Sequence, residues 1–155
     1  MEKVFRYHLK MVREKGVVYN TLGGSNEAKK QCLKFFKDML DSPTEALGVI
    51  ACDVHNRPIG YYIASEGTPN ASLVDPRNVF AIALQLMATT IILCHNHPSG
   101  DCNPSREDFA VTERITKAGE ILNIKVIDHI IIGKDPIKIK SEAVSVMEAM
   151  HELWN

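Results

Sequence analysis

The residue types best suited to chemistry gather in one stretch, residues 89–108, which reads T-T-I-I-L-C-H-N-H-P-S-G-D-C-N-P-S-R-E-D. An apolar run at residues 89–94 is typical of a buried strand, and it ends in His95 and His97. In a strand that continues, residues i and i+2 point to the same face, so we expect the two imidazoles side by side. Asp108 follows a loop and lies in the first turn of an expected helix. Two histidines, one carboxylate and a fourth position left to water are a common ligand set of catalytic zinc.

The same residues also have simpler interpretations. Ser105, with Asp108 three residues later, resembles a helix-capping pair, and aspartate is favoured in the first turn of any helix. Cys94 and Cys102 flank the histidines and offer a structural cysteine–histidine zinc site as an alternative. Cys94 directly precedes His95, however, so their side chains diverge if the strand continues. The pattern H-x-H-P, six residues and S-x-x-D is specific, and it favours the catalytic type of metal site.

This pattern resembles the metal-binding signature of the MPN (JAMM, JAB) metalloprotease domains, which is matched by His95, His97, Pro98, Ser105 and Asp108. The longer strings H-N-H-P-S-G-D and P-S-R-E-D, with D-H-I-I-I-G at residues 128–133, are similar to the RadC branch. The resemblance covers roughly residues 42–133. It implies an α/β fold, the MPN (JAB) domain, in which helices flank a mixed central sheet in a sandwich related to cytidine deaminases.

The resemblance also implies a role for individual residues. The zinc ligands are matched by His95, His97 and Asp108, the general base by Glu45 in P-T-E-A-L-G-V-I, and the serine that stabilises the oxyanion by Ser105. One Zn²⁺ bound per chain would lower the pKa of its water and polarise a carbonyl group. The sequence therefore predicts a zinc-dependent metallopeptidase or isopeptidase that acts on a peptide or an isopeptide-linked protein.

Several of these assignments have alternatives. Without the resemblance, Glu45 is a surface carboxylate at a strand edge, and Glu66 is a rival base at the end of a predicted hairpin. The RadC-like pattern usually carries a basic residue before Gly-Thr, whereas this chain has S-E-G-T. Helix capping explains Ser105 equally well. Asp128 and His129 are interpreted as structural residues or as outer hydrogen-bond partners of metal-bound histidines.

Hydrophobic periodicity predicts the elements that must position these residues. Strands are expected at residues 5–11, 46–52, 59–65, 89–94, 124–132 and 137–140, and helices at 25–40, from 76, at 105–122 and from Ser141. The helix from residue 76 is expected to turn inward Val79, Phe80, Ala83, Leu84 and Met87. Residues 1–41 should form a strand and a helix packed on the same globular unit as the MPN domain at residues 42–155.

Composition limits the function classes. The 155 residues are 45% hydrophobic and 24% charged, which is ordinary for one globular domain. No apolar run is long enough to span a bilayer, and the N-terminus lacks a signal-peptide core, so we expect a cytoplasmic protein without membrane contact. The four cysteines have no C-x-x-C spacing and are expected to be free thiols.

Two other functions remain as alternatives. One is a DNA repair-associated accessory protein, as the historical naming of RadC proteins suggests. A net charge of −1 and the lack of a Lys/Arg block give nucleic acid binding no support. Longer relatives carry a helix-hairpin-helix region, but residues 1–40 lack its glycine-rich hairpin, so we expect a short form. The other alternative is a non-catalytic MPN scaffold, against which the complete set of zinc ligands argues.

Overall fold

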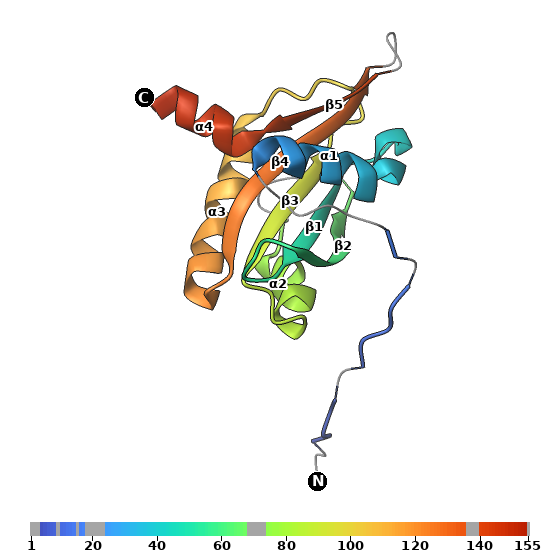
Figure 1. Cartoon of the computed structure of the whole chain (residues 1–155), viewed down its shortest axis with the longest axis vertical. Helices are drawn as coiled ribbons and strands as arrows, with labels where there is room; N and C mark the ends of the chain where they lie inside the picture. The colour runs from blue at the N-terminus through green and yellow to red at the C-terminus, as the bar shows by residue number, and fades with distance from the viewer. Residues whose placement is uncertain are drawn as a thin grey trace.

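The middle layer of the protein is a five-stranded mixed sheet with the order β2-β1-β3-β4-β5 (Figure 1). The computed structural model describes residues 4–8, 10–14, 16–17, 24–67, 74–135 and 140–154. Its strands are β1 (Ala46–Cys52), β2 (Pro58–Glu66), β3 (Thr90–Asn96), β4 (Lys125–Asp135) and β5 (Lys140–Ser145). Its helices are α1 (Ser25–Phe35), the 3₁₀ helix η1 (Lys37–Asp41), α2 (Pro76–Gln85), α3 (Arg106–Leu122) and α4 (Val146–Trp154). None of these helices is long and apolar enough to cross a membrane.

Strand directions determine which ends of the strands meet. β3 and β4 are parallel, whereas β1 runs antiparallel to both β2 and β3, and β5 is antiparallel to β4. Two parallel strands cannot be joined by a tight turn, and α3 supplies the crossover from β3 to β4. The predicted α/β sandwich with a mixed central sheet is confirmed.

A hydrophobic core lies on each face of the sheet. The first core includes Val79 and Phe80 of α2 and Ile115 of α3, and the second includes Cys32 and Phe35 of α1. Each large apolar side chain buried in this way contributes about 1.5–3 kcal/mol to folding. Successive β3 residues alternate between the two cores, because side chains of a strand alternate between faces.

The prediction of an N-terminal strand is wrong for the residues of this segment that the structure describes. Residues 4–8 and 10–14 form neither helix nor strand, and the side chains of Phe5 and Tyr7 are 65% and 83% exposed. Figure 1 shows this segment running away from the sheet. Alternation of apolar and polar residues indicates two faces, but a strand also needs a neighbouring strand edge for its hydrogen bonds. No such pairing is present in the described part of this segment.

Two helix predictions also need correction. The first helix ends at Phe35, and the chain continues as η1 instead of reaching residue 40 as α-helix. On α2, Val79, Phe80 and Ala83 are buried as predicted, but Leu84 and Met87 are exposed. α2 ends at Gln85, so Met87 lies beyond the helix, in a left-handed conformation with φ 54°.

The C-terminal elements begin later than predicted. The edge strand occupies Lys140–Ser145, while residues 136–139, where most of it was expected, lie outside the described residues. Ser141 therefore belongs to β5 and does not cap the last helix. That task falls to Ser145, whose Oγ accepts a hydrogen bond from the Glu148 amide at 3.0 Å, immediately before α4.

Candidate metal centre

The sheet topology brings the predicted site residues to one edge of the sheet. β3 carries His95 near its end, His97 directly follows the strand, and the loop leads into α3, which carries Asp108 in its first turn. β1 begins at the same edge because it is antiparallel to β3, with Leu47 paired opposite His95. Glu45 immediately precedes β1. Residues fifty positions apart in the sequence thus become neighbours.

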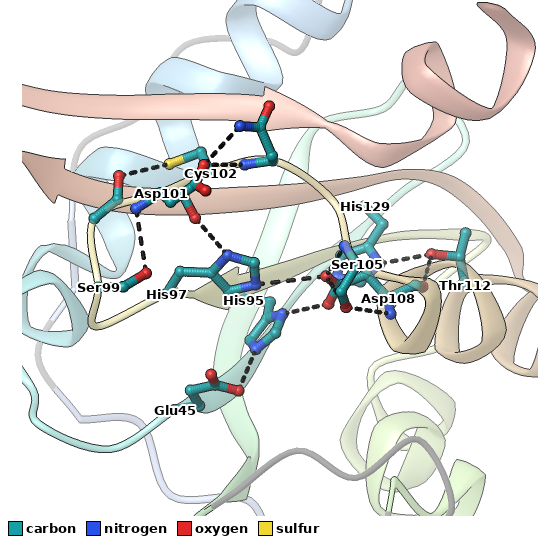
Figure 2. Close-up of polar contacts among 12 residues, drawn as sticks. Glu45, His95, His97, Ser99, Asp101, Cys102, Ser105, Asp108, Thr112 and His129 are labelled. Carbon is teal, nitrogen blue, oxygen red and sulfur yellow. Dashed lines mark hydrogen bonds and ion pairs between the residues drawn. The ribbon is translucent and has the colours of Figure 1, made fainter. Parts of the chain in front are cut away.

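Asp108 faces both imidazoles (Figure 2). Its Oδ1 is 3.0 Å from His95 Nδ1, and its Oδ2 is 3.5 Å from His97 Nε2. One potential ligand atom from each of these three residues lies within 4.8 Å of the others. His95 and Asp108 are buried, and His97 is partly exposed, so the cluster opens toward solvent on the His97 side.

The loop after β3 fixes the protonation of His97. Its Nδ1 lies 2.6 Å from the carbonyl oxygen of Asp101, which can only accept a hydrogen bond. Nδ1 must therefore carry the proton and donate it to this carbonyl. In the neutral ring, the lone pair is then on Nε2, the nitrogen that faces Asp108. A backbone carbonyl bound to the outer nitrogen is a common partner of metal-binding histidines.

The surroundings of His95 fit a divalent cation. Its Nε2 is 3.2 Å from Glu45 Oε2, while its Nδ1 faces Asp108, so both ring nitrogens point at carboxylate oxygens. A neutral imidazole has one N–H, and its second nitrogen would place a lone pair against a carboxylate. Either a second proton on the ring or a cation bound by the cluster removes this repulsion. Two imidazoles and a carboxylate as ligands suit Zn²⁺, and also other first-row divalent metals.

Ser105 and Asp108 form a reciprocal capping box at the start of α3. The Ser105 amide and hydroxyl both donate to Asp108 Oδ2 at 2.7 Å, and the Asp108 amide donates back to Ser105 Oγ at 3.2 Å. Burial raises the pKa of Asp108, but the His95 and His97 rings that face it and the hydrogen bonds from Ser105 outweigh burial and hold the pKa well below its usual value. Asp108 is therefore ionised at neutral pH, which is the state that a metal ligand needs.

His129 lies beneath the cluster without bonding to His95 or His97. Its Nδ1 is 2.7 Å from the Thr112 hydroxyl, which also bonds to the backbone carbonyl of Asp108 at 2.7 Å. Burial, reinforced by the nearby His95, lowers the pKa of His129 to about 3, so the ring is neutral. Its Nε2 has no hydrogen-bond partner among the described residues. His129 thus links β4 to the first turns of α3.

Asp128 points to the other side of the sheet. Its Oδ1 accepts from the Ser145 hydroxyl at 2.6 Å and from the His129 amide at 2.8 Å. The structural interpretation of Asp128 therefore holds. The outer partner that was expected for a ligand histidine is instead the Asp101 carbonyl, which no sequence pattern identifies because any residue type has one.

The cysteines next to the histidines do not join the cluster. Cys94 is buried in the core on the α1 side of the sheet, as the alternation along β3 predicted. Cys102 is also buried, which raises the pKa of its thiol to about 11, and its Sγ lies against the carbonyl oxygens of Gly100 and Glu142. Cys102 therefore anchors the loop to the sheet, and the structural cysteine–histidine site is not formed.

Sequence reasoning missed Asn96, which stands between the two histidines. It is buried on the α1 side and hydrogen-bonds to the chain around Glu45. A signal was available, because a polar residue inside a buried strand must find hydrogen-bond partners.

Comparison with known proteins gives consistent matches. A family model for the RadC-like JAB domain matches residues 26–148. The UPF0758 protein TTE0897 of Caldanaerobacter subterraneus subsp. tengcongensis is 52% identical over 89 residues, which are 57% of this chain and 38% of that relative. UPF0758 proteins of Pelobacter propionicus and Trichlorobacter lovleyi are each 48% identical over 99 residues, which are 64% of this chain and 43% of each relative. The chain therefore spans less than half the length of these curated relatives.

Proposed function

Because this chain belongs to the RadC-like JAB domain family, we propose that it is a zinc-dependent hydrolase of the JAMM type that cleaves a peptide or isopeptide bond. The observation that carries the proposal is the cluster of His95, His97 and Asp108, with the Glu45 carboxylate facing it. When bound, Zn²⁺ would supply a water of lowered pKa and a Lewis acid for the substrate carbonyl. The three clustered side chains would hold it.

Glu45 is the proposed general base. Its carboxylate reaches His95 at the edge of the cluster, and its side chain is 33% exposed, so it meets both the site and the solvent. A carboxylate in this place can take a proton from the attacking water and deliver it to the leaving amine. Glu66 is the weaker candidate, because it is exposed at the end of β2 and the contact to His95 is made by Glu45.

Ser105 is proposed to act in two ways. Its hydroxyl proton is held by Asp108 Oδ2, so its first task is to orient a metal ligand. The same hydroxyl is the proposed donor to negative charge that develops on the substrate carbonyl oxygen. This second task requires the hydroxyl to leave Asp108.

Metal content tests the proposal directly. Purified wild-type protein should contain about one zinc per chain by elemental mass spectrometry, which is the stoichiometry of a single catalytic site. Asp108→Asn should contain none, because it loses the negative charge and one ligand oxygen. Glu107→Gln is the matched control, since it removes the adjacent, exposed carboxylate of the same helical turn and should keep the metal. A wild-type protein that stays free of metal after zinc is supplied would contradict the proposal.

Hydrolysis is tested next, on a synthetic peptide library and on isopeptide-linked conjugates analysed by mass spectrometry. Glu45→Gln should keep its metal and lose cleavage by a factor of about 10²–10⁴, the usual contribution of a general base. Glu66→Gln should cleave like the wild type. If Glu66→Gln is the inactive variant, the base has been assigned to the wrong glutamate.

A further inference from the structure

Asn96 lies between two proposed metal ligands in the sequence but on the opposite side of the sheet from them. It is 1% exposed, which is unusual for an amide side chain. His95 faces the α3 side, so the alternation of a strand turns Asn96 toward the α1 side. There it meets the segment that connects η1 to β1.

The Asn96 amide makes three hydrogen bonds, and two of them flank Glu45. Its Oδ1 accepts from the Ala46 amide at 2.7 Å, and its Nδ2 donates to the Thr44 carbonyl at 3.1 Å. Nδ2 also donates to the Met39 carbonyl at 2.9 Å, in the middle of η1. The backbone is thus held on both sides of Glu45 by one side chain.

These three hydrogen bonds explain why residue 96 is an asparagine. An amide offers one accepting oxygen and two N–H donors, which match one backbone N–H and two carbonyls. A leucine of similar size would leave the Ala46 amide without its acceptor and would remove one donor from each of the Thr44 and Met39 carbonyls. An ionised aspartate would face the two carbonyls with an oxygen that cannot donate. β1 pairing holds Glu45 only through its carbonyl oxygen, which accepts from the Gly67 amide at 2.9 Å, because this residue lies before the strand and the segment from Ser42 to Glu45 has no regular structure.

We propose that Asn96 is a positioning residue that holds the Glu45 carboxylate at the metal centre. The proposal rests on the proposed role of Glu45 as the general base. Three consecutive residues then act on both sides of the sheet. His95 and His97 are the proposed metal ligands on one side, and Asn96 holds the segment around Glu45 on the other, as a clamp. Displacement of a catalytic group by as little as 1 Å is costly to the rate, so the clamp contributes to turnover without touching substrate.

The first experiment is amide hydrogen exchange by NMR in the metal-free protein. Asn96→Ala should accelerate exchange about tenfold at Ala46, which loses its acceptor. It should also accelerate exchange at Gly67, whose amide donates to the Glu45 carbonyl at 2.9 Å. Ser145→Ala is the control, because it removes the hydrogen bonds to Asp128 and to the Glu148 amide while the contacts of Asn96 stay intact, so both amides should be unchanged. Unchanged exchange at Ala46 and Gly67 in Asn96→Ala would overturn the proposal.

The second experiment is a double-mutant cycle with Glu45→Gln, measured on a substrate found in the cleavage screen. Asn96→Ala should lower kcat about 10–100-fold, part of the full contribution of a general base, and leave KM and metal content within about twofold. Added to Glu45→Gln, it should lower kcat no further, because a residue that acts only through Glu45 has nothing left to position. Additive losses, or loss of the metal, would assign Asn96 a merely structural role.

The two experiments separate failure of the clamp from failure of the proposed function. If the wild type binds no metal or cleaves nothing, the hydrolase proposal fails, while exchange at Ala46 and Gly67 still decides whether Asn96 holds Glu45. If Asn96→Ala does not fold, Asn96→Ser carries the same measurements. Its uncharged side chain is too short to bond to Ala46, Thr44 and Met39 together, so its effects should be the same in kind.

Discussion

At the scale of single residues, Asp108 serves as both a helix cap and a member of the metal cluster. Its Oδ1 faces His95, whereas its Oδ2 accepts two bonds from Ser105 and faces His97 at a longer distance. The sequence offered capping and metal binding as competing explanations, because each accounts for a carboxylate in the first turn of a helix. They are compatible, since a carboxylate has about four lone-pair sites and the cap occupies part of them.

The neutral state of His129 predicts a pH dependence of stability in the metal-free protein. The folded-state pKa, about 3, lies below the ordinary value of 6.5, so the unfolded chain binds more protons between these limits. Stability should therefore fall as the pH drops from 6.5 toward 3. In urea unfolding, His129→Gln should reduce the change in the free energy of unfolding between pH 7 and pH 5. The substitution of the exposed His55 by Gln should not reduce it. Equal slopes in wild type and His129→Gln would show that another group causes the loss.

At the scale of elements, helices and strands were predicted correctly where the sequence pattern that defines them is local. β3 was expected from a continuous apolar run, and α3 from the S-x-x-D cap at Ser105, and both were found. The segment around Phe5 has a clear alternation but no pairing edge among the described residues, so its pattern did not determine its structure. β5 was misplaced for a related reason, because a strand at the edge of a sheet is defined by its register against β4.

The loop between β3 and α3 rests on β4 at a point where only glycine fits. A Cβ on Gly133 would lie 2.8 Å from Cys102 Sγ and 2.9 Å from the Gly100 carbonyl oxygen. Gly133→Ala should therefore displace the loop that orients His97 and weaken zinc binding at least tenfold in a competition assay with a chromophoric chelator, a change of about 1.4 kcal/mol.

The control for this loop prediction is Gly16→Ala, because nothing lies within 4 Å of the added carbon there. Gly16→Ala should bind zinc like the wild type. Wild-type affinity in Gly133→Ala would mean that the loop adapts without moving the ligands.

At the scale of the whole molecule, the topology is what joins Glu45 to the ligands. The spacing of His95, His97 and Asp108 could be recognised within one stretch of sequence. The place of Glu45 could not, since it depends on β1 lying antiparallel beside β3, and only a resemblance to a family pointed to it. Asn96 was missed for the same reason, because its three partners lie fifty or more positions away.

The charge of the whole chain predicts how it behaves with nucleic acid. A net charge of −1 provides no excess of cations to release counterions from DNA. In fluorescence anisotropy with a short labelled duplex, we expect no saturable binding at low salt, with a basic DNA-binding domain as the positive control. A binding constant that falls with salt concentration, linearly on a double-logarithmic plot, would instead support the DNA-associated alternative.

The position of Glu45 limits how this site could be moved to another protein. A graft of residues 95–108 onto a foreign strand–loop–helix would carry all three proposed ligands together with the capping box. It would not carry the proposed base, which lies just before β1, nor the chain segment that Asn96 holds. Such a chimera should be a metal-binding protein without hydrolytic power. The smallest transferable unit of the proposed site therefore runs from η1 through Glu45 to the end of β1, and includes β3, the loop after it and the start of α3.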